Sequence, residues 1–394
     1  MTVLDLTHWI AGPYATKMLA DLGARVVKVE RPGGDPGREL EPFLADQRGP
    51  ERSAMFQFLN TNKEGIVLDL TVGAGRAALY RLVEHADLVV TSSSPRVEEQ
   101  LGIDYASLRA HGDPAVLSIT NFGHTGPYRD YQISETMLYG MGGEMFGHGL
   151  ASREPLKLGG TAALLQSGAM AGLAAMGAVT AREVHGIGQL VEVSLFEAQI
   201  ASMDRRSSAI LGYRFSGRVV ERPAVAAAGI AGGVYPTEDG YVEVTASGGN
   251  YWDRFMEMVG DDAFNDPKWS RPETLRDPAA KEEVDGVVYP WMLTHTRAQI
   301  WDRAREVHAL VAPYFTGVDV MNDKVFRERG LWTEIEHPEL GTRPMLGRPY
   351  MFERTPWQLR RPAPTLGQDT DSVLSWAGFD SDTIAKLHAD GVVA

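Results

Sequence analysis

The feature that most constrains the fold is an alternation of short apolar strands and helices that starts at the first residues. Residues 2–6 (TVLDL) are typical of a buried strand, residues 11–23 of a helix, and residues 24–30 (ARVVKVE) of a second strand. Pro13 suits the first turn of this helix and Gly23 suits its end. Strand, helix and strand in this order form a βαβ unit, which predicts a parallel sheet.

The alternation continues through the first third of the chain and predicts an α/β fold. We expect an open, doubly wound, Rossmann-like parallel sheet, because strands keep alternating with helices. The further elements expected in this part are strands at 65–70, 87–92 and 115–123 and helices at 73–86 and 107–112. Those expected after it are helices within 134–149 and 161–186 and a strand that enters a helix within 190–206.

The chain changes character near residue 217, which predicts a second domain. Residues 217–233 are typical of a linker, and residues 233–247 of a β-hairpin that turns at Glu238, Asp239 and Gly240. The helices expected after the hairpin lie at 251–260 and 296–307. The expected domains are the N-terminal part of a large domain at 1–222, a small α+β domain at 223–330, and the C-terminal part of the large domain at 331–394.

Composition limits the partners of the chain. A net charge of -14 over 394 residues disfavours a nucleic-acid surface, and the lack of cysteine excludes disulfides and thiolate nucleophiles. The longest apolar stretch, 162–180, is interrupted by Gln166, Ser167 and three glycines, so we expect a buried helix and not a membrane span. The first residues lack the pattern of a signal peptide, and we expect a cytoplasmic protein.

Several common catalytic and cofactor motifs are missing from the sequence. Glu30 ends the second strand where a dinucleotide fold places its ribose acid, but the turn after the first strand is not G-x-G-x-x-G. We therefore reject a nicotinamide site. The chain has no Walker A loop, no G-x-S-x-G elbow and no histidine pair at metal-binding spacing, so no metal is expected.

Four polar residues remain as candidates, each with a simpler explanation. Arg38 and Lys63 lie in loops at strand ends, where two cations can hold phosphates or can be solvated surface charges. Glu135 stands at the start of an expected helix, where it is either an active-site acid or part of the helix cap. His124 follows a strand and either faces a cleft or stabilises its loop.

Residues 3–39, VLDLTHWIAGPYATKMLADLGARVVKVERPGGDPGRE, resemble the opening of the family III CoA-transferases. This family includes formyl-CoA and carnitine CoA-transferases and 2-methylacyl-CoA racemase. Further similar stretches follow in the same order as in the family: FLNTNKEGIVLDL, ADLVVTSSSPRVEEQLGIDY, AVLSITNFGHTGPYRD, GQLVEVSLFEAQIA and APTLGQDTDSVL. The resemblance covers nearly the whole chain.

The resemblance implies a fold, an assembly and a chemistry. Family members form interlocked dimers, with the active site between the large domain of one chain and the small domain of its partner. They hold no permanent cofactor, and an acyl-CoA thioester is a substrate together with a carboxylic acid. An Asp carboxylate attacks the thioester and gives a mixed anhydride and CoA thiolate. In the racemase branch this Asp and a His move the proton beside the thioester carbonyl.

Carried over position by position, the resemblance implies site residues and several departures. The positions that bind CoA in relatives correspond to Arg38, Leu59, Asn62, Lys63, Ser92 and Ser93. Ser92 and Ser93 replace an Asn-Phe pair, and Lys17 replaces a Gln. Glu135 matches an acidic active-site position, whereas Ser134 replaces the racemase His. The mobile glycine-rich loop of the family is Ala-rich here, AVAAAGIAGG.

The sharpest departure is Leu164, which stands at the position of the nucleophilic Asp. No acidic residue lies between Pro155 and Ala181 that a shifted alignment could place there. Three interpretations remain. The chain is the non-nucleophilic subunit of a heteromeric CoA-transferase, as in the benzylsuccinate CoA-transferase type. Alternatively it is a stand-alone lyase, hydratase or isomerase with Glu135 as general base, assisted by Lys17 or His124, or a CoA-thioester binding protein without turnover.

Overall fold

The computed structural model contains two compact units, each formed from separate stretches of the chain. It describes every residue except 202–204, 220, 223–229, 247–249, 272 and 275–276. Unit 1 consists of residues 1–148, 155–221 and 328–394, and unit 2 of residues 149–154 and 222–327. The limits of the small domain expected from the sequence, 223 and 330, stay a prediction.

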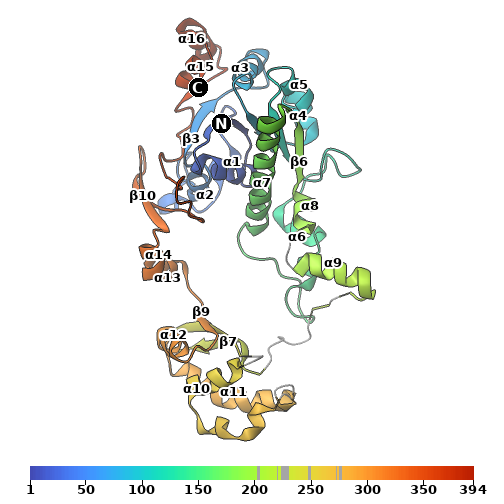
Figure 1. Cartoon of the computed structure of the whole chain (residues 1–394). Coiled ribbons are helices and arrows are strands. Elements are labelled where there is room, and N and C mark those ends of the chain that lie inside the picture. The colour runs from blue at the N-terminus through green and yellow to red at the C-terminus, as the bar shows by residue number, and fades with distance from the viewer. Residues whose placement is uncertain (202–204, 220, 223–229, 247–249, 272, 275–276) are drawn as a thin grey trace. The chain divides into compact units, whose positions relative to one another are not determined.

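Unit 1 is organised around a six-stranded parallel sheet with the order β3-β2-β1-β4-β5-β6 (Figure 1). The strands are β1 (Thr2–Leu6), β2 (Arg25–Glu30), β3 (Lys63–Val67), β4 (Leu88–Thr91), β5 (Ala115–Thr120) and β6 (Leu190–Ser194). The order reverses between β1 and β4, as in a doubly wound Rossmann sheet. The expected α/β fold with a Rossmann-like parallel sheet is confirmed.

Helices cover both faces of this sheet. One face packs against α3 (Gly73–Val83), α5 (Tyr105–Arg109), α15 (Thr370–Trp376) and α16 (Ser381–Ala389). The other face packs against α1 (Ala11–Asp21) and α7 (Ala162–His185). Because both faces are covered, the central strands are mostly apolar, and the charged Asp5 of β1 and Lys28 of β2 are buried in ion pairs.

The helices α1 and α7 approach each other closely because α7 presents glycines to α1. A Cβ atom at Gly168 would lie 2.5 Å from the carbonyl oxygen of Ala11, and one at Gly172 would lie 3.4 Å from the sulfur of Met18. Among the described helices, α7 is also the one long and apolar enough to span a membrane by length and composition alone. Its Ala171, Ala175, Ala178 and Val179 are buried in the core of unit 1, as expected for a packed helix.

The C-terminal stretch returns to the edge of the sheet beside β3, so both ends of the chain belong to unit 1 (Figure 1). It contains the hairpin of β10 (Trp332–His337) and β11 (Gly341–Leu346), followed by α15 and α16. Backbone contacts fasten it: the amide of Gly65 donates to Asp369, and the amide of Asp69 donates to the carbonyl of Val392.

Unit 2 has a small antiparallel sheet and its own core. The sheet order is β7-β8-β9, with β7 (Gly232–Thr237), β8 (Gly240–Thr245) and β9 (Val311–Pro313). Its largest helices are α10 (Tyr251–Val259), α11 (Pro278–Leu293) and α12 (Arg297–Glu306). Trp252, Phe255 and Trp269 are buried in the core. The hairpin expected at 233–247 corresponds to β7 and β8, and unit 2 has the expected α+β composition.

Some elements differ from the sequence-based expectation. The helix α4 (Pro95–Leu101) was not expected, although Pro95 at its start is a helix signal. The helix α11 was also missed, because Pro290 interrupts its pattern. The remaining helices of unit 1 that bear on the site are the following: α2 (Ala54–Leu59), α6 (Glu135–Met141) and α8 (Leu195–Ile200).

Candidate functional site

Two cavities lie side by side at the carboxyl edge of the sheet, beside the reversal between β1 and β4. Ligands of open α/β sheets bind at this edge, because the loops that leave β1 and β4 diverge there and leave a crevice. His8, Trp9, Ser93 and Val97 line both cavities, so the two are adjacent. We call the first the strand-end cavity and the second the Glu135 cavity.

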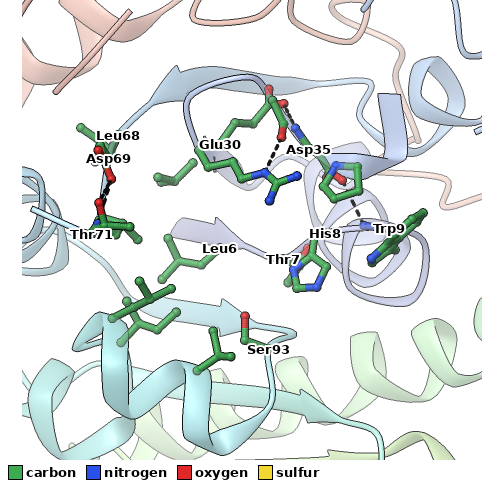
Figure 2. Close-up of a pocket in the computed structure, with 18 residues that line it drawn as sticks. Leu6, Thr7, His8, Trp9, Glu30, Asp35, Leu68, Asp69, Thr71 and Ser93 are labelled. Atoms are coloured by element: carbon green, nitrogen blue, oxygen red, sulfur yellow. Dashed lines mark hydrogen bonds between the residues drawn. The ribbon is translucent and has the colours of Figure 1, made fainter. Parts of the chain in front are cut away.

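The strand-end cavity has a volume of about 470 Å³ and is drawn in Figure 2. Four successive strand ends contribute to it: Leu6 to Trp9 after β1, Val29 to Arg31 after β2, Leu68 to Thr71 after β3, and Ser93 after β4. Arg31 is the one Lys or Arg among the described residues that line it, and it is exposed. Three carboxylates, those of Glu30, Asp35 and Asp69, also line it, and the first two are held in ion pairs with Arg38 and Lys28. The apolar remainder suits a planar group, and Arg31 is the cation at the rim that can meet phosphates.

The Glu135 cavity has a volume of about 640 Å³. It lies among the loops after β1, β4 and β5 and the starts of α6, α7 and α8. Its lining combines polar side chains from these loops and helix starts with a larger number of apolar side chains. The residues that line it are His8 to Gly12, Leu40, Ser92 to Ser94, Val97, Ile119, Asn121, Gln132 to Glu135, Leu138, Thr161, Leu164 and Leu195. This set brings Glu135, Leu164, Ser134, Ser92 and Ser93 together.

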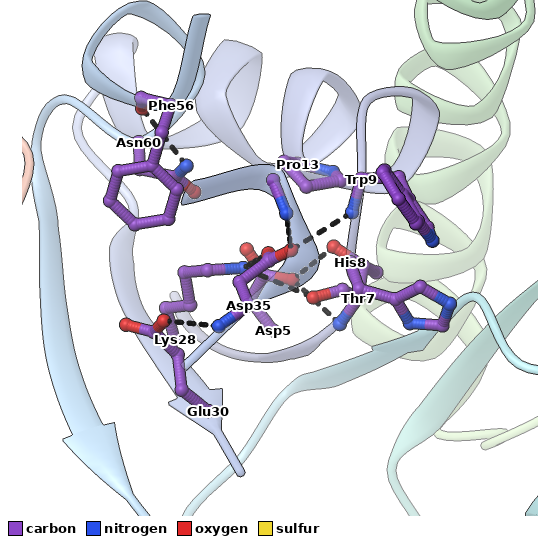
Figure 3. Close-up of polar contacts among 12 residues, drawn as sticks. Asp5, Thr7, His8, Trp9, Pro13, Lys28, Glu30, Asp35, Phe56 and Asn60 are labelled. Atoms are coloured by element: carbon purple, nitrogen blue, oxygen red, sulfur yellow. Dashed lines mark hydrogen bonds and ion pairs between the residues drawn. The ribbon is translucent and has the colours of Figure 1, made fainter. Parts of the chain in front are cut away.

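A buried polar network underlies the loop that separates the two cavities (Figure 3). Lys28 forms an ion pair of 2.6 Å with Asp35, and its ammonium also donates to the carbonyl of Thr7. Asp35 accepts hydrogen bonds from the amides of Trp9 and Gly37. Trp9 has a positive φ of 67°, which this clamp holds in place. The network therefore fixes the turn that lines both cavities.

The second half of the network involves Asp5 and Lys63. Their side chains are fully buried and lie 2.9 Å apart. Burial alone would raise the pKa of Asp5, but the Lys63 and Lys28 charges hold it far below its usual value. Burial lowers the pKa of Lys63 to about 8, despite the attraction of Asp5. Lys63 also donates to Pro13, Thr16 and Asn60, so its ammonium is fully coordinated within the chain.

The structure places the other expected CoA-binding residues of this region within buried contacts as well. Arg38 is 2% exposed, forms ion pairs of 2.7 Å with Glu30 and Glu51, and stacks on Phe56. Leu59 has no exposed surface. Asn62 bonds to Asp21 and accepts from the amides of residues 360 and 361, and so fastens the C-terminal stretch. In this structure these residues shape the loops around the cavities.

Ser92 and Ser93 lie on the loop after β4 and line the Glu135 cavity. The amide of His8 donates to the Ser92 hydroxyl at 2.9 Å, which ties the loop after β1 to the loop after β4. The His8 ring also contacts this hydroxyl through Nδ1 at 3.2 Å. Burial lowers the pKa of His8. The imidazole is therefore neutral at pH 7 and offers no charge to the cavity.

Glu135 is fixed by contacts on both carboxylate oxygens. Oε1 accepts from the amide of Ala163 at 3.1 Å, and Oε2 lies 3.1 Å from the Lys157 ammonium. Lys157 also donates to the carbonyls of Leu158 and Gly160 at 2.7 Å. The side chain of Thr161, the cap residue of α7, makes no capping bond. Glu135 therefore supplies from α6 the capping interaction that α7 lacks.

Leu164 is the third residue of α7 and lines the same cavity. It packs against an apolar cluster that contains Leu138, Tyr139 and Ala163. Ser134, the residue before Glu135, caps α6 through a hydrogen bond from the amide of Met137. At both positions the cavity holds residue types that neither attack a carbonyl readily nor exchange a proton near neutral pH.

Lys17 and His124 lie elsewhere and are not among the described residues that line either cavity. Lys17 is 4% exposed, and its ammonium contacts Asp21 and Thr61, each at 2.7 Å. His124 contacts the Ser118 hydroxyl through Nε2 at 2.9 Å. The structure therefore brings neither residue to Glu135.

Three residues of the site were missed by the sequence analysis. Arg31 directly follows β2, and this position at a carboxyl strand end is the signal that could have found it. Trp9 follows the first strand in the same way. Lys157 had no such signal, because its contact with Glu135 joins the start of α6 to a loop residue 22 positions further along the chain.

The sequence as a whole matches the family model described as CoA-transferase family III over residues 1–370. The chain belongs to CoA-transferase family III. The resemblance in the sequence is thereby confirmed. Members of the family act on CoA thioesters and carboxylic acids, and some are subunits of heteromeric transferases.

Curated relatives match over the full length. The chain is 29% identical to succinyl-CoA–D-citramalate CoA-transferase of Chloroflexus aurantiacus, covering 99% of this chain and 96% of the relative. It is 30% identical to succinyl-CoA:(R)-benzylsuccinate CoA-transferase subunit BbsE of Thauera aromatica, covering 99% and 97%. The fold also matches a CAIB/BAIF family protein from Brucella suis, at 26% identity and a TM-score of 0.84, covering 96% of this chain and 98% of that structure.

Proposed function

We propose that this chain binds an acyl-CoA thioester at the two cavities and serves as the non-nucleophilic subunit of a heteromeric CoA-transferase. The observation that carries the proposal is Leu164, which lines the Glu135 cavity at the position where family resemblance places the nucleophilic Asp. No acid stands within residues 156–180, and a leucine can neither form an anhydride nor accept a proton.

The nucleophilic carboxylate then comes from a homologous partner. In its own site the partner's Asp attacks the carbonyl of a second thioester that is bound there, the carbon–sulfur bond breaks, and an acyl-aspartyl anhydride and CoA thiolate result. The thiolate attacks the aspartyl carbonyl and releases the acyl group as a carboxylate. The acceptor acid then takes CoA by the same steps in reverse. A BbsE subunit among the relatives, at 30% identity, supports an assembly of this kind.

The proposed ligand pose follows the two cavities. The nucleotide part of CoA lies in the strand-end cavity with Arg31 near its phosphates, and the acyl part lies in the Glu135 cavity. The linking arm passes His8 and Ser93, which line both cavities, and Ser92, which lines the Glu135 cavity. Of the remaining expected CoA-binding residues, we propose that Arg38, Leu59, Asn62 and Lys63 position the loops from beneath.

A second candidate is a stand-alone lyase, hydratase or isomerase with Glu135 as general base. It is favoured by Glu135 being the one carboxylate among the described residues that line the cavity. Its requirement is that the bonds to Ala163 and Lys157 loosen when substrate binds, because both carboxylate oxygens are engaged in this structure. A CoA-thioester binding protein without turnover is the third candidate.

A cytoplasmic location and an interlocked homodimer or heteromer stay predictions.

The assembly expressed in its native host decides between these candidates. We expect native mass spectrometry to show this chain with a homologous Asp-bearing chain. We also expect CoA transfer from the complex and none from the isolated chain. A homodimer that turns over acyl-CoA alone, and loses this activity with E135Q, would replace the first proposal by the second. A homodimer that binds CoA thioesters without turnover would leave the third.

A further inference from the structure

Among the described residues that line the Glu135 cavity, none offers a free positive charge to a substrate carboxylate. Of the described residues that line it, His8 and Glu135 are the two with ionisable side chains. Burial lowers the pKa of His8, so the imidazole is neutral at pH 7. Glu135 is an acid. The lining therefore carries either no charge or a negative one, and it lacks the Arg or Lys that commonly binds a carboxylate.

The cation beside this lining is Lys157, and its donors are already used. A lysine ammonium has three N–H donors. The Lys157 ammonium has three oxygen partners: the Glu135 carboxylate and the carbonyls of Leu158 and Gly160. The carboxylate of a substrate would have to replace Glu135 at this ammonium, and the partly buried Glu135 would then lose its ion pair.

Apolar side chains provide the other part of the lining. Ile133, Leu138, Leu164 and Leu195 belong to one packed cluster and all line the cavity. Ile133 precedes α6, and the other three come from α6, α7 and α8; their packing in one cluster makes them a continuous wall. Leu164 lies within this wall. Replacing an acid by leucine at this position thus extends an apolar surface into the cavity.

We propose that the Glu135 cavity takes an uncharged, apolar acyl group, seated on the wall of Ile133, Leu138, Leu164 and Leu195. An acyl group that ends in a carboxylate would lose its hydration there without gaining a cation. An alkyl or aryl group would instead bury apolar surface against four branched side chains. This inference rests on the proposal that the cavity receives the acyl part of a CoA thioester.

The test compares ligands that share CoA and differ only in the acyl group. Calorimetry on the full-length chain would measure CoA, octanoyl-CoA, phenylacetyl-CoA and succinyl-CoA. We expect the two apolar thioesters to bind at least about tenfold more tightly than CoA, and succinyl-CoA no more tightly than CoA. Succinyl-CoA binding as tightly as octanoyl-CoA would overturn the inference. Absence of binding by every ligand, CoA included, would overturn the proposed function as well.

Two variants locate the binding to the wall. Leu164→Ala and Leu195→Ala shorten partly buried side chains and leave the strand-end cavity intact. Each is expected to weaken octanoyl-CoA binding about three- to tenfold with no change for CoA. Val234→Ala, an exposed position on β7 of unit 2, is the matched control. Equal affinity of all three variants for octanoyl-CoA would show that the acyl group lies elsewhere.

Discussion

The carboxylate of Glu135 accepts a hydrogen bond of 3.1 Å from the amide of Ala163, the residue before Leu164. The acid that opens α6 thus holds the first turn of α7, which contains Leu164. Lys157 completes this arrangement from the loop before α7. The carboxylate is therefore part of the framework of the cavity, whatever further role it has in chemistry.

Removing the Glu135 carboxylate is expected to destabilise the chain. Glu135→Ala leaves the Ala163 amide and the Lys157 ammonium without their partner, at a cost of about 1–3 kcal/mol in free energy of unfolding. Glu135→Gln keeps an acceptor for the amide and should cost less. Urea denaturation of both variants measures this order. Glu353→Ala, at an exposed position, is the control and should leave stability unchanged.

Placing an acid at position 164 tests the proposal that Leu164 keeps this chain from forming an acyl-enzyme. Leu164→Asp should form an acyl-enzyme with acyl-CoA, seen as a mass increase of the intact chain and released by hydroxylamine. The third residue of a helix also tolerates an acid, since the helix dipole favours negative charge there.

Leu164→Asn matches this variant in size and polarity and should show no adduct. An adduct in both variants, or in the parent chain, would place the nucleophile at another residue. Because Leu164 packs against other apolar residues, either variant should also lower the free energy of unfolding by about 1–3 kcal/mol.

Arg31 is expected to contribute to CoA affinity through the phosphates. Arg31→Gln removes the one Lys or Arg charge among the described residues at the strand-end cavity. A lost charge-assisted contact should weaken CoA binding by about tenfold or more, and more at low ionic strength. Pantetheine lacks the phosphates and serves as the matched ligand. An equal loss for pantetheine would argue against phosphate contact, and Arg354→Gln controls for net charge.

The fold was predictable because its signals are local. The run TVLDL, the helix after it and the run ARVVKVE each have a period that one strand or helix explains, and the sheet follows from their order. The site was less predictable, because it depends on side-chain partners that are distant in the chain. The sequence places Lys63 beside a strand as a candidate phosphate ligand, but in the structure it is the first residue of β3 and its partner Asp5 lies 58 residues away. The burial of Lys63 and its pairing with Asp5 determine which atoms its ammonium contacts. Neither can be predicted from the positions of the two residues in the sequence.

The contact of α7 with α1 predicts opposite effects for two glycines of one helix. Gly168→Ala would put a methyl group 2.5 Å from the carbonyl oxygen of Ala11 and push the helices apart. We expect a loss of about 1–3 kcal/mol in free energy of unfolding. Gly177→Ala meets open space and should gain about 0.5–1 kcal/mol from helix propensity. Thermal or urea unfolding measures both. Similar changes in the two variants would contradict the close contact.

A buried acid beneath the sheet edge gives the chain a pH-dependent stability. Glu98 of α4 is 1% exposed and accepts hydrogen bonds from the hydroxyls of Thr91 and Ser118. Burial raises its pKa to about 7, although these bonds act in the opposite direction. The folded chain therefore binds a proton at Glu98 between pH 4.5 and 7 that the unfolded chain has released. Stability from this group is complete below pH 4.5 and is lost as the pH rises through 7.

Replacing Glu98 with glutamine should remove this pH dependence. Glu98→Gln keeps an oxygen that can accept from Thr91 and Ser118 but cannot ionise. Relative to the parent chain, its free energy of unfolding should therefore improve by about 2–3 kcal/mol between pH 5 and pH 8. Urea denaturation at several pH values measures this difference. Glu353→Gln should show no such trend, and a constant offset between Glu98→Gln and the parent chain would mean that Glu98 ionises normally in the folded protein.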